Sequence, residues 1–357
     1  MSHSINSNEI YEATENNYII DVDVASMYPA LFINLKLYPK HLGKELLKVY
    51  TELYNKRLEL KPLAKTDKKI KGITDGIKLI LNSFYGKVGS IDSWSFDKKV
   101  AFTICLSGQL SLFMLVEQFE KHGIKVFYQN TDGVTTIVPK DKIDKFREIC
   151  REWEGITNLV LEEVQYKKML LADVNNYIAI DENDKVKKKG LFLTDYELWK
   201  NKSYRVVSLA LEEYFIHKKD PIKFIKSHTN IFDFCIMAKA TGKLHLEEQY
   251  LDKNEELVTV KHKKLIRYYL SNTGRTLYKR GIGNTGKPMN NHVNAPNELG
   301  SQYIQYFNEY SKKDNYKVEH KHYILKCLNI IDKIEKTKRA EQYINSLKPQ
   351  LQLSIFS

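Results

Sequence analysis

The stretch Asp21-Val-Asp-Val-Ala-Ser-Met-Tyr-Pro29 decides how the rest of this sequence is interpreted. It follows the apolar run Tyr18-Ile19-Ile20, which indicates a buried β-strand with a carboxylate, Asp23, near its end. Carboxylate oxygens are hard ligands that suit Mg²⁺, and the backbone after Asp23 offers a carbonyl to the same ion. An aspartate at a strand end is also a common turn residue or helix cap. The stretch alone leaves both interpretations open.

The composition is that of a globular, basic protein. The chain has 357 residues, of which 43% are hydrophobic, so it is long enough for two or three subdomains. It carries 56 Lys and Arg against 44 Asp and Glu, a net charge of +12, which favours a polyanionic partner such as nucleic acid. The 23 tyrosines can fill cores or stack on bases.

Neither cysteine chemistry nor a membrane anchor is predicted. The four cysteines are far apart and form no C-x-x-C pair, which argues against a zinc site or a disulfide framework and indicates a reducing cytoplasm. The start of the chain, Met1-Ser-His-Ser, is polar and unlike a signal peptide. We expect no apolar run of membrane-spanning length and no membrane partner.

The first half of the chain predicts an α+β fold. Apolar spacing indicates a hairpin of two helices over residues 44–63 and 73–85, and then a long apolar helix over 100–122. Two short β runs around Gln129-Asn-Thr-Asp-Gly133 predict a β-hairpin whose polar tip carries Asp132. A helix over 140–153 and strands over 159–164, 169–180 and 186–190 follow.

The second half is predicted to be mainly helical. After Phe192 the chain is strongly basic, and helices are expected from Leu299 and again over 323–347. The cations that we expect to mark this half are Lys261, Lys263, Lys264, Arg267, Arg275, Lys279 and Arg280.

Three patterns occur in order along the chain. They are Asp23-x-x-Ser-Met-Tyr-Pro29, Lys78-x-x-x-Asn82-Ser-x-Tyr85-Gly86 and Tyr128-Gln-Asn-Thr-Asp132-Gly133. Together they resemble motifs A, B and C of the family B DNA polymerases, and the match covers residues 18–190. Each motif alone would be weak, whereas three in the correct order are specific.

The resemblance implies a right-hand polymerase of α+β class, with an antiparallel-sheet palm, short two-helix fingers and a mainly helical thumb. The implied division is palm at 1–41, fingers at 42–90, palm again at 91–192, thumb at 193–345 and a C-terminal tail at 346–357. Because residues 191 onward match the family poorly, the thumb assignment rests on order, helix content and charge.

The resemblance also implies a two-metal site for nucleotidyl transfer. Such sites hold two ions about 3.5–4 Å apart, one at the primer 3′-OH and one at the triphosphate. By resemblance, Asp23, Asp132 and the main-chain carbonyl of Val24 are the protein ligands, and Mg²⁺ is the expected ion, with Mn²⁺ as a substitute.

Several residues of motifs A and B resemble the family's nucleotide-binding residues. Ser26, Met27 and Tyr28 would contact the incoming nucleotide, and the Tyr28 ring would exclude a 2′-OH, which selects dNTPs. A tyrosine packed in the core is the alternative for Tyr28. Lys78 is expected to act on the triphosphate as a catalytic cation, with Asn82 on the same helical face.

Two further cations and a set of DNA contacts follow from the same resemblance. Arg57 and Lys61 resemble the phosphate-gripping pair of the fingers, although a solvated basic face would look the same. The residues expected to contact primer–template DNA are Tyr85, Gly86, Thr131, Lys168, Tyr177 and Lys189.

The chain departs from the family at two motifs. Motif C usually reads Asp-Thr-Asp-Ser, but here Asn130 replaces the first, more peripheral aspartate, so an active enzyme is still expected. Asp21 is a candidate to compensate in part. The family's Lys-x-Tyr segment is Asn175-Asn-Tyr177, which keeps the tyrosine and lacks the lysine. Lys167, Lys168, Lys188 and Lys189 are the cations expected to supply those phosphate contacts.

No exonuclease motif is present, and Met1 falls about where the family's exonuclease linker would end. Proofreading is therefore expected on a separate exonuclease subunit or not at all. The short segment between motifs A and B favours a DNA or RNA primer over a protein primer. The compact sequence, rich in Lys, Asn, Ile and Tyr, suggests a phage or mobile element in a bacterial cytoplasm.

The chain ends in Gln352-Leu-Ser-Ile-Phe-Ser357, which is similar to the peptide with which bacterial polymerases bind the sliding clamp. Leu353, Ile355 and Phe356 would enter an apolar groove, with Gln352 at its edge. Pro349 is expected to separate this tail from the last helix. A tail packed on its own thumb is the alternative.

The sequence therefore predicts a template-directed DNA polymerase that adds dNTPs to a primer 3′ end, as one part of a split or truncated enzyme. Two other classes stay open. One is a catalytically weakened, DNA-binding replication subunit derived from a polymerase, and the other is a nucleotidyltransferase that uses RNA or NTPs.

Overall fold

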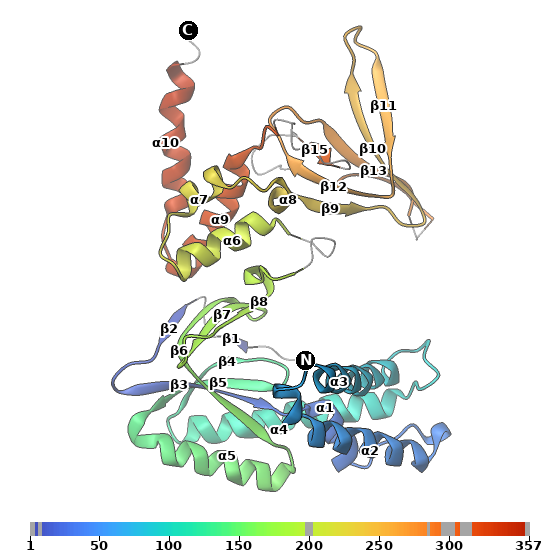
Figure 1. Cartoon of the computed structure of the whole chain (residues 1–357), viewed down its shortest axis with the longest axis vertical. Helices are drawn as coiled ribbons and strands as arrows, with labels where there is room; N and C mark the ends of the chain where they lie inside the picture. The colour runs from blue at the N-terminus through green and yellow to red at the C-terminus, as the bar shows by residue number, and fades with distance from the viewer. Residues whose placement is uncertain are drawn as a thin grey trace. The chain divides into compact units, whose positions relative to one another are not determined.

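The computed structural model describes residues 4–5, 9–196, 203–283, 286–293, 304–307 and 316–353. The chain folds into two compact units (Figure 1). Unit 1 comprises residues 1–174 and 179–187, and unit 2 comprises residues 175–178 and 188–357. Motifs A, B and C all lie in unit 1.

An antiparallel sheet carries motifs A and C. Its strand order is β1-β4-β5-β3-β6-β7-β8, and β2 pairs with β6. The central strand β3 lies between β5 and β6 and is antiparallel to both. Because it is covered on both faces, Ile19, Ile20, Val22 and Val24 are all buried. The strands are β1 Ser4–Ile5, β2 Ile10–Glu12, β3 Asn17–Val24, β4 Lys125–Gln129, β5 Gly133–Pro139, β6 Leu161–Asp173, β7 Asn176–Asp181 and β8 Val186–Lys189.

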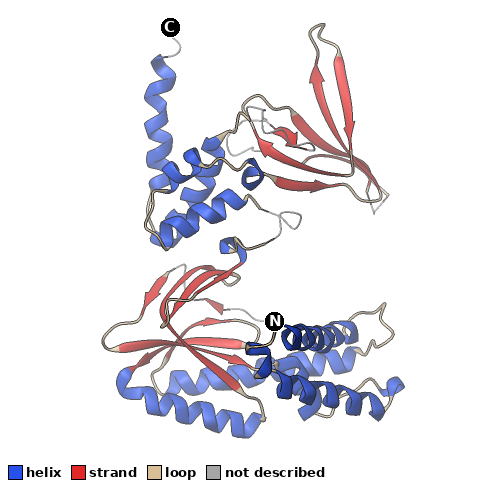
Figure 2. Ribbon diagram, in the orientation of Figure 1, coloured by secondary structure: helices blue, strands red, loops and turns tan. Residues whose placement is uncertain are grey.

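The helices of unit 1 lie beside this sheet. Figure 2 shows α4 and α5 along one face of it, where both contribute apolar side chains to the core. Asp67 and Asp97 cap α3 and α4 by accepting backbone N–H groups of the first turn. The α-helices are α1 Met27–Asn34, α2 Lys44–Leu60, α3 Lys68–Val88, α4 Lys98–Lys121 and α5 Ile143–Thr157, with short 3₁₀ turns at Lys40–Leu42, Leu63–Lys65 and Lys140–Lys142.

The predicted helical hairpin is confirmed as α2 and α3. Each helix directs one row of side chains towards the hydrophobic core. Tyr50 on α2 and Leu81 on α3 are therefore buried, while most of their neighbours are exposed. The Tyr50 hydroxyl donates a hydrogen bond of 3.0 Å to the Leu81 carbonyl and joins the two helices. The rings of Phe32, Tyr50 and Phe84 pack together and link the hairpin to α1. The observed helices end within a few residues of the predicted bounds, which periodicity alone places loosely.

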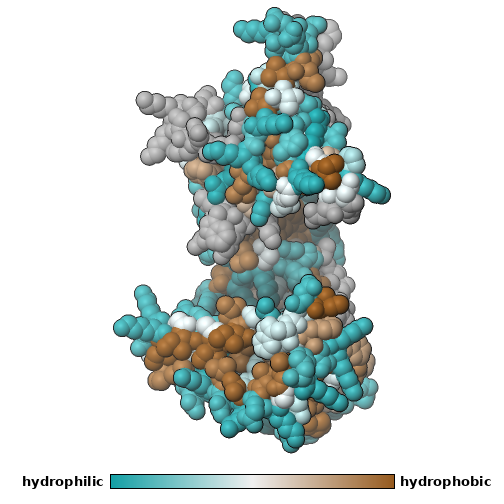
Figure 3. Space-filling view, turned by 90° about the vertical axis from the view of Figure 1, so that its right-hand side faces the viewer, coloured by the Kyte–Doolittle hydropathy of each residue, from teal (hydrophilic) through white to brown (hydrophobic). Residues whose placement is uncertain are grey.

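The long apolar helix α4 corrects one expectation. It is long and apolar enough to cross a membrane by length and composition alone. Its inner side chains, however, belong to the core of unit 1. Its outer side chains Phe102, Leu106, Leu110 and Phe113 are exposed. Figure 3 shows hydrophobic patches among hydrophilic residues on the presented face of this unit.

Unit 2 is not mainly helical, so that prediction is wrong. The described part of residues 236–307 contains seven strands in two antiparallel sheets, in the orders β11-β10-β13-β14 and β15-β12-β9. The strands are β9 Ile236–Lys239, β10 Lys243–Leu251, β11 Leu257–His262, β12 Leu265–Leu270, β13 Thr276–Ile282, β14 Pro288–His292 and β15 Ile304–Phe307. The helices are α6 Arg205–Phe215, α7 Pro221–Ser227, α8 Ile231–Phe234, α9 His320–Glu335 and α10 Arg339–Leu353, after a 3₁₀ turn at Gly190–Phe192.

Buried ion pairs of β10 explain why its sequence did not show the alternation of apolar and polar residues that predicts a strand. Glu247 and Glu248 are buried, where a strand pattern leads one to expect apolar residues. Arg280 donates to Glu247 over 2.6 Å, and Arg275 donates to Glu248 over 3.2 Å. Both arginines are among the cations that we expected to mark this half, and they pair with the buried carboxylates of β10.

The end of the chain also differs from the expectation. The helix predicted over 323–347 is two helices, because Lys336 adopts a left-handed conformation with φ 55° between α9 and α10. Pro349 does not end the last helix, since α10 continues to Leu353. Gln352 and Leu353 are therefore helical, and Ile355 and Phe356 lie outside the described residues. The helix expected from Leu299 falls partly on β15 and otherwise outside the described residues.

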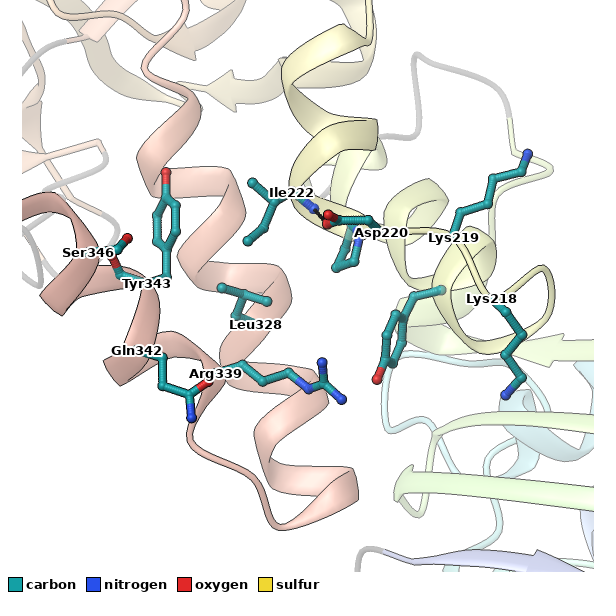
Figure 4. A pocket seen from close by; sticks show the side chains of 11 residues that line it. Lys218, Lys219, Asp220, Ile222, Leu328, Arg339, Gln342, Tyr343 and Ser346 are labelled. Atoms are coloured by element: carbon teal, nitrogen blue, oxygen red, sulfur yellow. Dashed lines mark hydrogen bonds between the residues drawn. The ribbon is translucent and has the colours of Figure 1, made fainter.

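A cavity of about 550 Å³ lies in unit 2 among α7, α9 and α10. Figure 4 shows Ile222, Leu328 and Tyr343 facing one another across it. Two cations at its edge are paired, Lys219 with Glu213 and Arg339 with Glu335. The cavity contains none of the predicted site residues.

Candidate active site

The antiparallel ladder between β3 and β5 brings motifs A and C together. Asp23 is the register partner of Gly133, the residue that follows Asp132. The Val24 N–H donates a hydrogen bond of 2.7 Å to the Asp132 carbonyl, which extends the ladder by one residue. Two aspartates that are 109 positions apart (132 minus 23) therefore share one end of a strand pair, as the sequence predicted.

The Asp23 carboxylate has two different oxygens. Oδ1 is buried and has no hydrogen-bond partner among the described residues, whereas Oδ2 lies 3.8 Å from the Lys187 ammonium. The carboxylate rests against Gly133, where a Cβ would collide with Oδ1. In this chain, the glycine at position 133 leaves room for the Asp23 carboxylate.

Asn130 holds the tip of the β4–β5 hairpin. Its side-chain oxygen accepts hydrogen bonds from the N–H of Asp132 at 2.9 Å and of Gly133 at 2.6 Å. Its own N–H donates to the Gly133 carbonyl at 3.0 Å. This is an Asx-type turn, which the side-chain oxygen of Asp or Asn can accept equally. The replacement in motif C therefore preserves the backbone on which Asp132 depends.

Asp21 is a buried carboxylate two residues before Asp23, and its side chain lies on the same face of β3. Burial, and then repulsion by Asp23, raise the pKa of Asp21 from 3.8 to about 6. Hydrogen bonds partly offset this: Thr135 donates to Asp21 at 2.6 Å and Tyr166 donates at 3.4 Å. Lys187, 3.8 Å away, also lowers the Asp21 pKa. Asp21 is thus anchored by protein donors beside Asp23.

The motif A turn is joined to the helical hairpin. Ser26 adopts a left-handed conformation with φ 52°, unusual for a residue with a side chain. Arg57 on α2 donates a hydrogen bond of 2.8 Å to the Ser26 hydroxyl, and its Nε is buried without a partner among the described residues. Lys61, one turn further on, is paired with Glu162 of β6. Of the two predicted phosphate-binding cations, Arg57 therefore contacts the turn and Lys61 is held by a carboxylate.

Tyr28 connects motif A with motif B. Its ring stacks on that of Tyr85 on α3, with centroids 4.1 Å apart and planes 11° apart. Burial, followed by Cys105 and Asp132, raises the pKa of Tyr28 to about 12, so its hydroxyl is neutral at physiological pH. A small hollow next to Tyr28 is also lined by Thr131 and Gln129. Tyr28 is therefore half-buried, packed against the core of unit 1 and lining this hollow.

Motif B presents its polar residues outward on α3. Lys78, Asn82 and Gly86 are exposed, and they follow one another at intervals of one turn on the face that carries Tyr85. The Tyr85 hydroxyl contacts the Cys105 thiol on α4, and burial followed by that contact raises the Tyr85 pKa. The structure therefore places the exposed cation of Lys78 on the same helical face as the tyrosine stacked on motif A.

Three other predicted residues are placed less favourably. The Met27 side chain is buried against Gly108, so the side chain itself is not available to a nucleotide. Lys168 pairs with Glu12 of β2. Tyr177 is only 3% exposed, with the Lys189 ammonium 5.6 Å from its ring centroid. Its prediction as a DNA contact is at odds with this burial.

The residues present fit a divalent cation at Asp23. A buried carboxylate oxygen without a hydrogen-bond donor is costly unless a cation or solvent satisfies it. Asp23 Oδ1 is such an oxygen, and the ligand types nearby are the carboxylate and carbonyl oxygens that Mg²⁺ prefers. No group of three or more His, Cys, Asp or Glu side chains arranged around one point occurs among the described residues. Any ion here would rely on the two carboxylates, a main-chain carbonyl and its substrate.

Sequence reasoning missed the partners of the two aspartates on β3. Thr135, Tyr166 and above all Lys187 surround Asp21 and Asp23, although none belongs to a motif. Lys187 was part of a basic strand with no assigned role. The approach of the Lys187 side chain to β3 is a tertiary contact that local sequence patterns do not contain, so no sequence signal identifies it.

Similar proteins include several archaeal DNA polymerases. DNA polymerase 1 of Pyrococcus abyssi (strain GE5 / Orsay) and the DNA polymerase of Thermococcus gorgonarius are each 24% identical over 249 residues, covering 59% of this chain and 32% of theirs. No family model matches. The family B DNA polymerase of Pyrobaculum calidifontis superimposes with a TM-score of 0.49 at 16% identity, over 94% of this chain and 47% of that one.

This chain is similar to the family B DNA polymerases. It spans about a third of the length of the curated relatives that it matches. The resemblance stated from motifs A, B and C is confirmed at the level of the family.

Proposed function

We propose that this chain is the polymerase core of a family B enzyme, which extends a primer 3′ end with dNTPs as directed by a template. The observation that carries the proposal is the site at the end of β3 and β5. There, Asp23 pairs with Gly133 in the β3–β5 ladder, and the Val24 N–H donates a hydrogen bond to the Asp132 carbonyl. Oδ1 of Asp23 is buried and has no hydrogen-bond donor among the described residues. This is the environment expected of a metal-binding carboxylate pair.

Asp23, Asp132 and the Val24 carbonyl would hold the divalent ions, which activate the primer hydroxyl and offset charge on the triphosphate when bound. The chain's own residues do the remaining work. Gly133 and the Asn130 turn fix the two aspartates. Lys78 is an exposed cation that can approach a triphosphate, and Asn82 lies one turn away from it. Arg57 braces the Ser26 turn beside the nucleotide position.

The stack of Tyr28 on Tyr85 supports the proposed selection of dNTPs. A ring held by a neighbouring ring cannot easily rotate away from a ribose 2′-OH. Lys61 would have to leave Glu162 before it could grip a phosphate, and this exchange is part of the proposal.

The right-hand division into palm, fingers, thumb and tail is retained as part of the proposal. The sheet with α1, α4 and α5 corresponds to the palm, and α2 with α3 to the fingers. The thumb would be unit 2, which combines helices with two sheets. A separate exonuclease subunit and a sliding clamp are the proposed partners. Because Gln352 and Leu353 are helical, clamp binding requires the last turn of α10 to open.

Primer extension tests the catalytic proposal. We expect incorporation with Mg²⁺ or Mn²⁺, and its loss, by at least about a thousandfold, in Asp23→Asn and Asp132→Asn because each removes a metal-binding charge. Asp141→Asn, which changes an exposed aspartate after β5, is the control and should keep wild-type activity. If wild type is no more active than Asp132→Asn, the chain is instead a DNA-binding subunit without catalysis.

A further inference from the structure

Lys187 is the cation nearest to the carboxylates of β3. It lies on β8, at the end of unit 1, and its Nζ is 3.8 Å from Oδ2 of both Asp21 and Asp23. It also donates a hydrogen bond of 3.2 Å to the Tyr166 hydroxyl. The ammonium therefore lies near Oδ2 of both aspartates, whereas Gly133 lies against Oδ1 of Asp23.

Asp21 and Tyr166 form a rigid support for this ammonium. Asp21 is only 5% exposed, and Thr135 holds its other oxygen at 2.6 Å. The Tyr166 hydroxyl donates to Asp21 and accepts from Lys187, so the three groups form one chain of hydrogen bonds. By contrast, the Asp23 side chain is 37% exposed and has no protein donor on Oδ1 among the described residues. Asp23 is the member of the cluster that can respond to a metal ion.

The two oxygens of Asp23 thus face different partners. The ammonium occupies the Oδ2 side, and Oδ1 is left for another cation. An ammonium beside a carboxylate fixes its orientation but also opposes a divalent ion that shares it. Asp21 contributes one negative charge and Lys187 one positive charge. Together they add no net charge beside Asp23, while the Lys187 ammonium holds the Asp23 carboxylate in place.

We propose that Lys187, supported by Asp21, is a positioning residue that orients the Asp23 carboxylate and limits the affinity of the site for divalent cations. The inference rests on the proposed function, because it takes Asp23 as a metal ligand. It adds that a balanced Asp–Lys pair, which no motif contains, sets how tightly the site binds an ion before DNA and nucleotide arrive.

Mn²⁺ binding to the full chain without DNA tests this, with the free ion quantified by EPR at pH 8. Lys187→Met should tighten binding by about three- to tenfold, because a positive charge leaves the vicinity of the ion. Asp21→Asn should weaken binding by a similar factor, and the double variant should return close to wild type. Lys187→Arg keeps the charge and should stay within about twofold of wild type.

Lys145→Met is the matched control, since its ammonium pairs with Glu148 at the surface of the same unit. It should leave Mn²⁺ affinity unchanged. A merely structural role of Lys187 would weaken binding in Lys187→Met, so weaker or unchanged binding in a variant that keeps the wild-type melting temperature overturns the inference. If Lys187→Met does not fold, Lys187→Gln and Asp21→Asn must still shift affinity in opposite directions.

Failure of the proposed function is separately visible. If wild type and Asp23→Asn bind Mn²⁺ equally, Asp23 is no ligand and both proposals fall. If Asp23→Asn loses binding while Lys187→Met and Asp21→Asn leave it unchanged, only the role of Lys187 is refuted.

Discussion

The carboxylate of Asp23 lies in the space that a side chain at Gly133 would occupy. Gly133→Ala should therefore displace Asp23 or force the two strands apart. We expect activity to fall by about a hundredfold or more, because small displacements of a catalytic group are costly. Primer extension measures the effect. Gly155→Ala on α5, where a Cβ meets open space, is the control and should leave activity unchanged. Wild-type activity in Gly133→Ala would show that the close approach is not required.

Asn130 should act through the turn that it holds. Asn130→Ala removes the acceptor for the N–H groups of Asp132 and Gly133, which frees the hairpin tip. We expect kcat to fall by about tenfold, the equivalent of about 1.4 kcal/mol for these hydrogen bonds. Asn130→Asp keeps the acceptor and should retain at least wild-type kcat. Equal losses in both variants would mean that the amide group itself is needed.

Tyr28 should govern the choice of sugar. Tyr28→Ala removes the ring that stacks on Tyr85, and we expect the preference for dNTP over NTP to fall by at least about tenfold. Tyr28→Phe keeps the ring and should keep the preference. Single-nucleotide incorporation with each sugar gives the ratio of kcat/KM values. An unchanged ratio in Tyr28→Ala would exclude Tyr28 as the selecting residue.

Asp21 should make unit 1 less stable as the pH rises. Its pKa is about 6 in the folded chain and 3.8 as a free group, so the folded state binds the proton more tightly. Stability from this group is present below pH 3.8 and is lost as the pH rises through 6, by up to about 3 kcal/mol. Asp21→Asn should therefore raise the unfolding free energy at pH 7.5 in EDTA, and have little effect at pH 4. A gain that is equal at both pH values would contradict the assignment.

His322 should have the opposite pH dependence in unit 2. Burial, and then Lys326, lower its pKa from 6.5 to about 4, and its ring packs edge-on against Tyr204 and Tyr323. The unfolded chain binds the proton first, so stability is lost as the pH falls from 6.5 towards 4, by about 3 kcal/mol. His322→Phe should remove this loss. Urea unfolding followed by tyrosine fluorescence at pH 7.5 and 5.0 measures it, and an unchanged difference between the two would refute it.

The sequence was most informative where local pattern and fold agree. The helical stripes of α2, α3 and α4 and the hairpin with Asp132 follow from apolar spacing and turn chemistry, so their positions were predicted within a few residues. The family resemblance then related Asp23 to Asp132. Neither source contains the register of β6, which places Tyr166 opposite Ile19 of β3, or the contact of the Lys187 side chain with Asp21 and Asp23.

The sheets of unit 2 show where prediction of secondary structure from the sequence failed. β10 has the sequence Lys-Leu-His-Leu-Glu-Glu-Gln-Tyr-Leu, in which two adjacent glutamates interrupt any alternation. Both are buried because they are neutralised by Arg280 on β13 and by Arg275, the residue just before that strand. A buried charge is recognisable only together with its partner, and the partner is about thirty residues away. The same limit applies at Lys61, whose carboxylate partner is on β6.

The position of β3 between β5 and β6 has a consequence for folding. Its ladder partners lie more than a hundred residues downstream. β3 can therefore pair only once the intervening chain, which includes α1 to α4, has closed into a loop. Loop closure of this length delays strand pairing but adds little to its equilibrium cost. The β3 amides should be among the last in unit 1 to exchange with deuterium. Asp23 and Asp132 would then meet only in molecules that have folded completely, so partly folded chains would carry no active site.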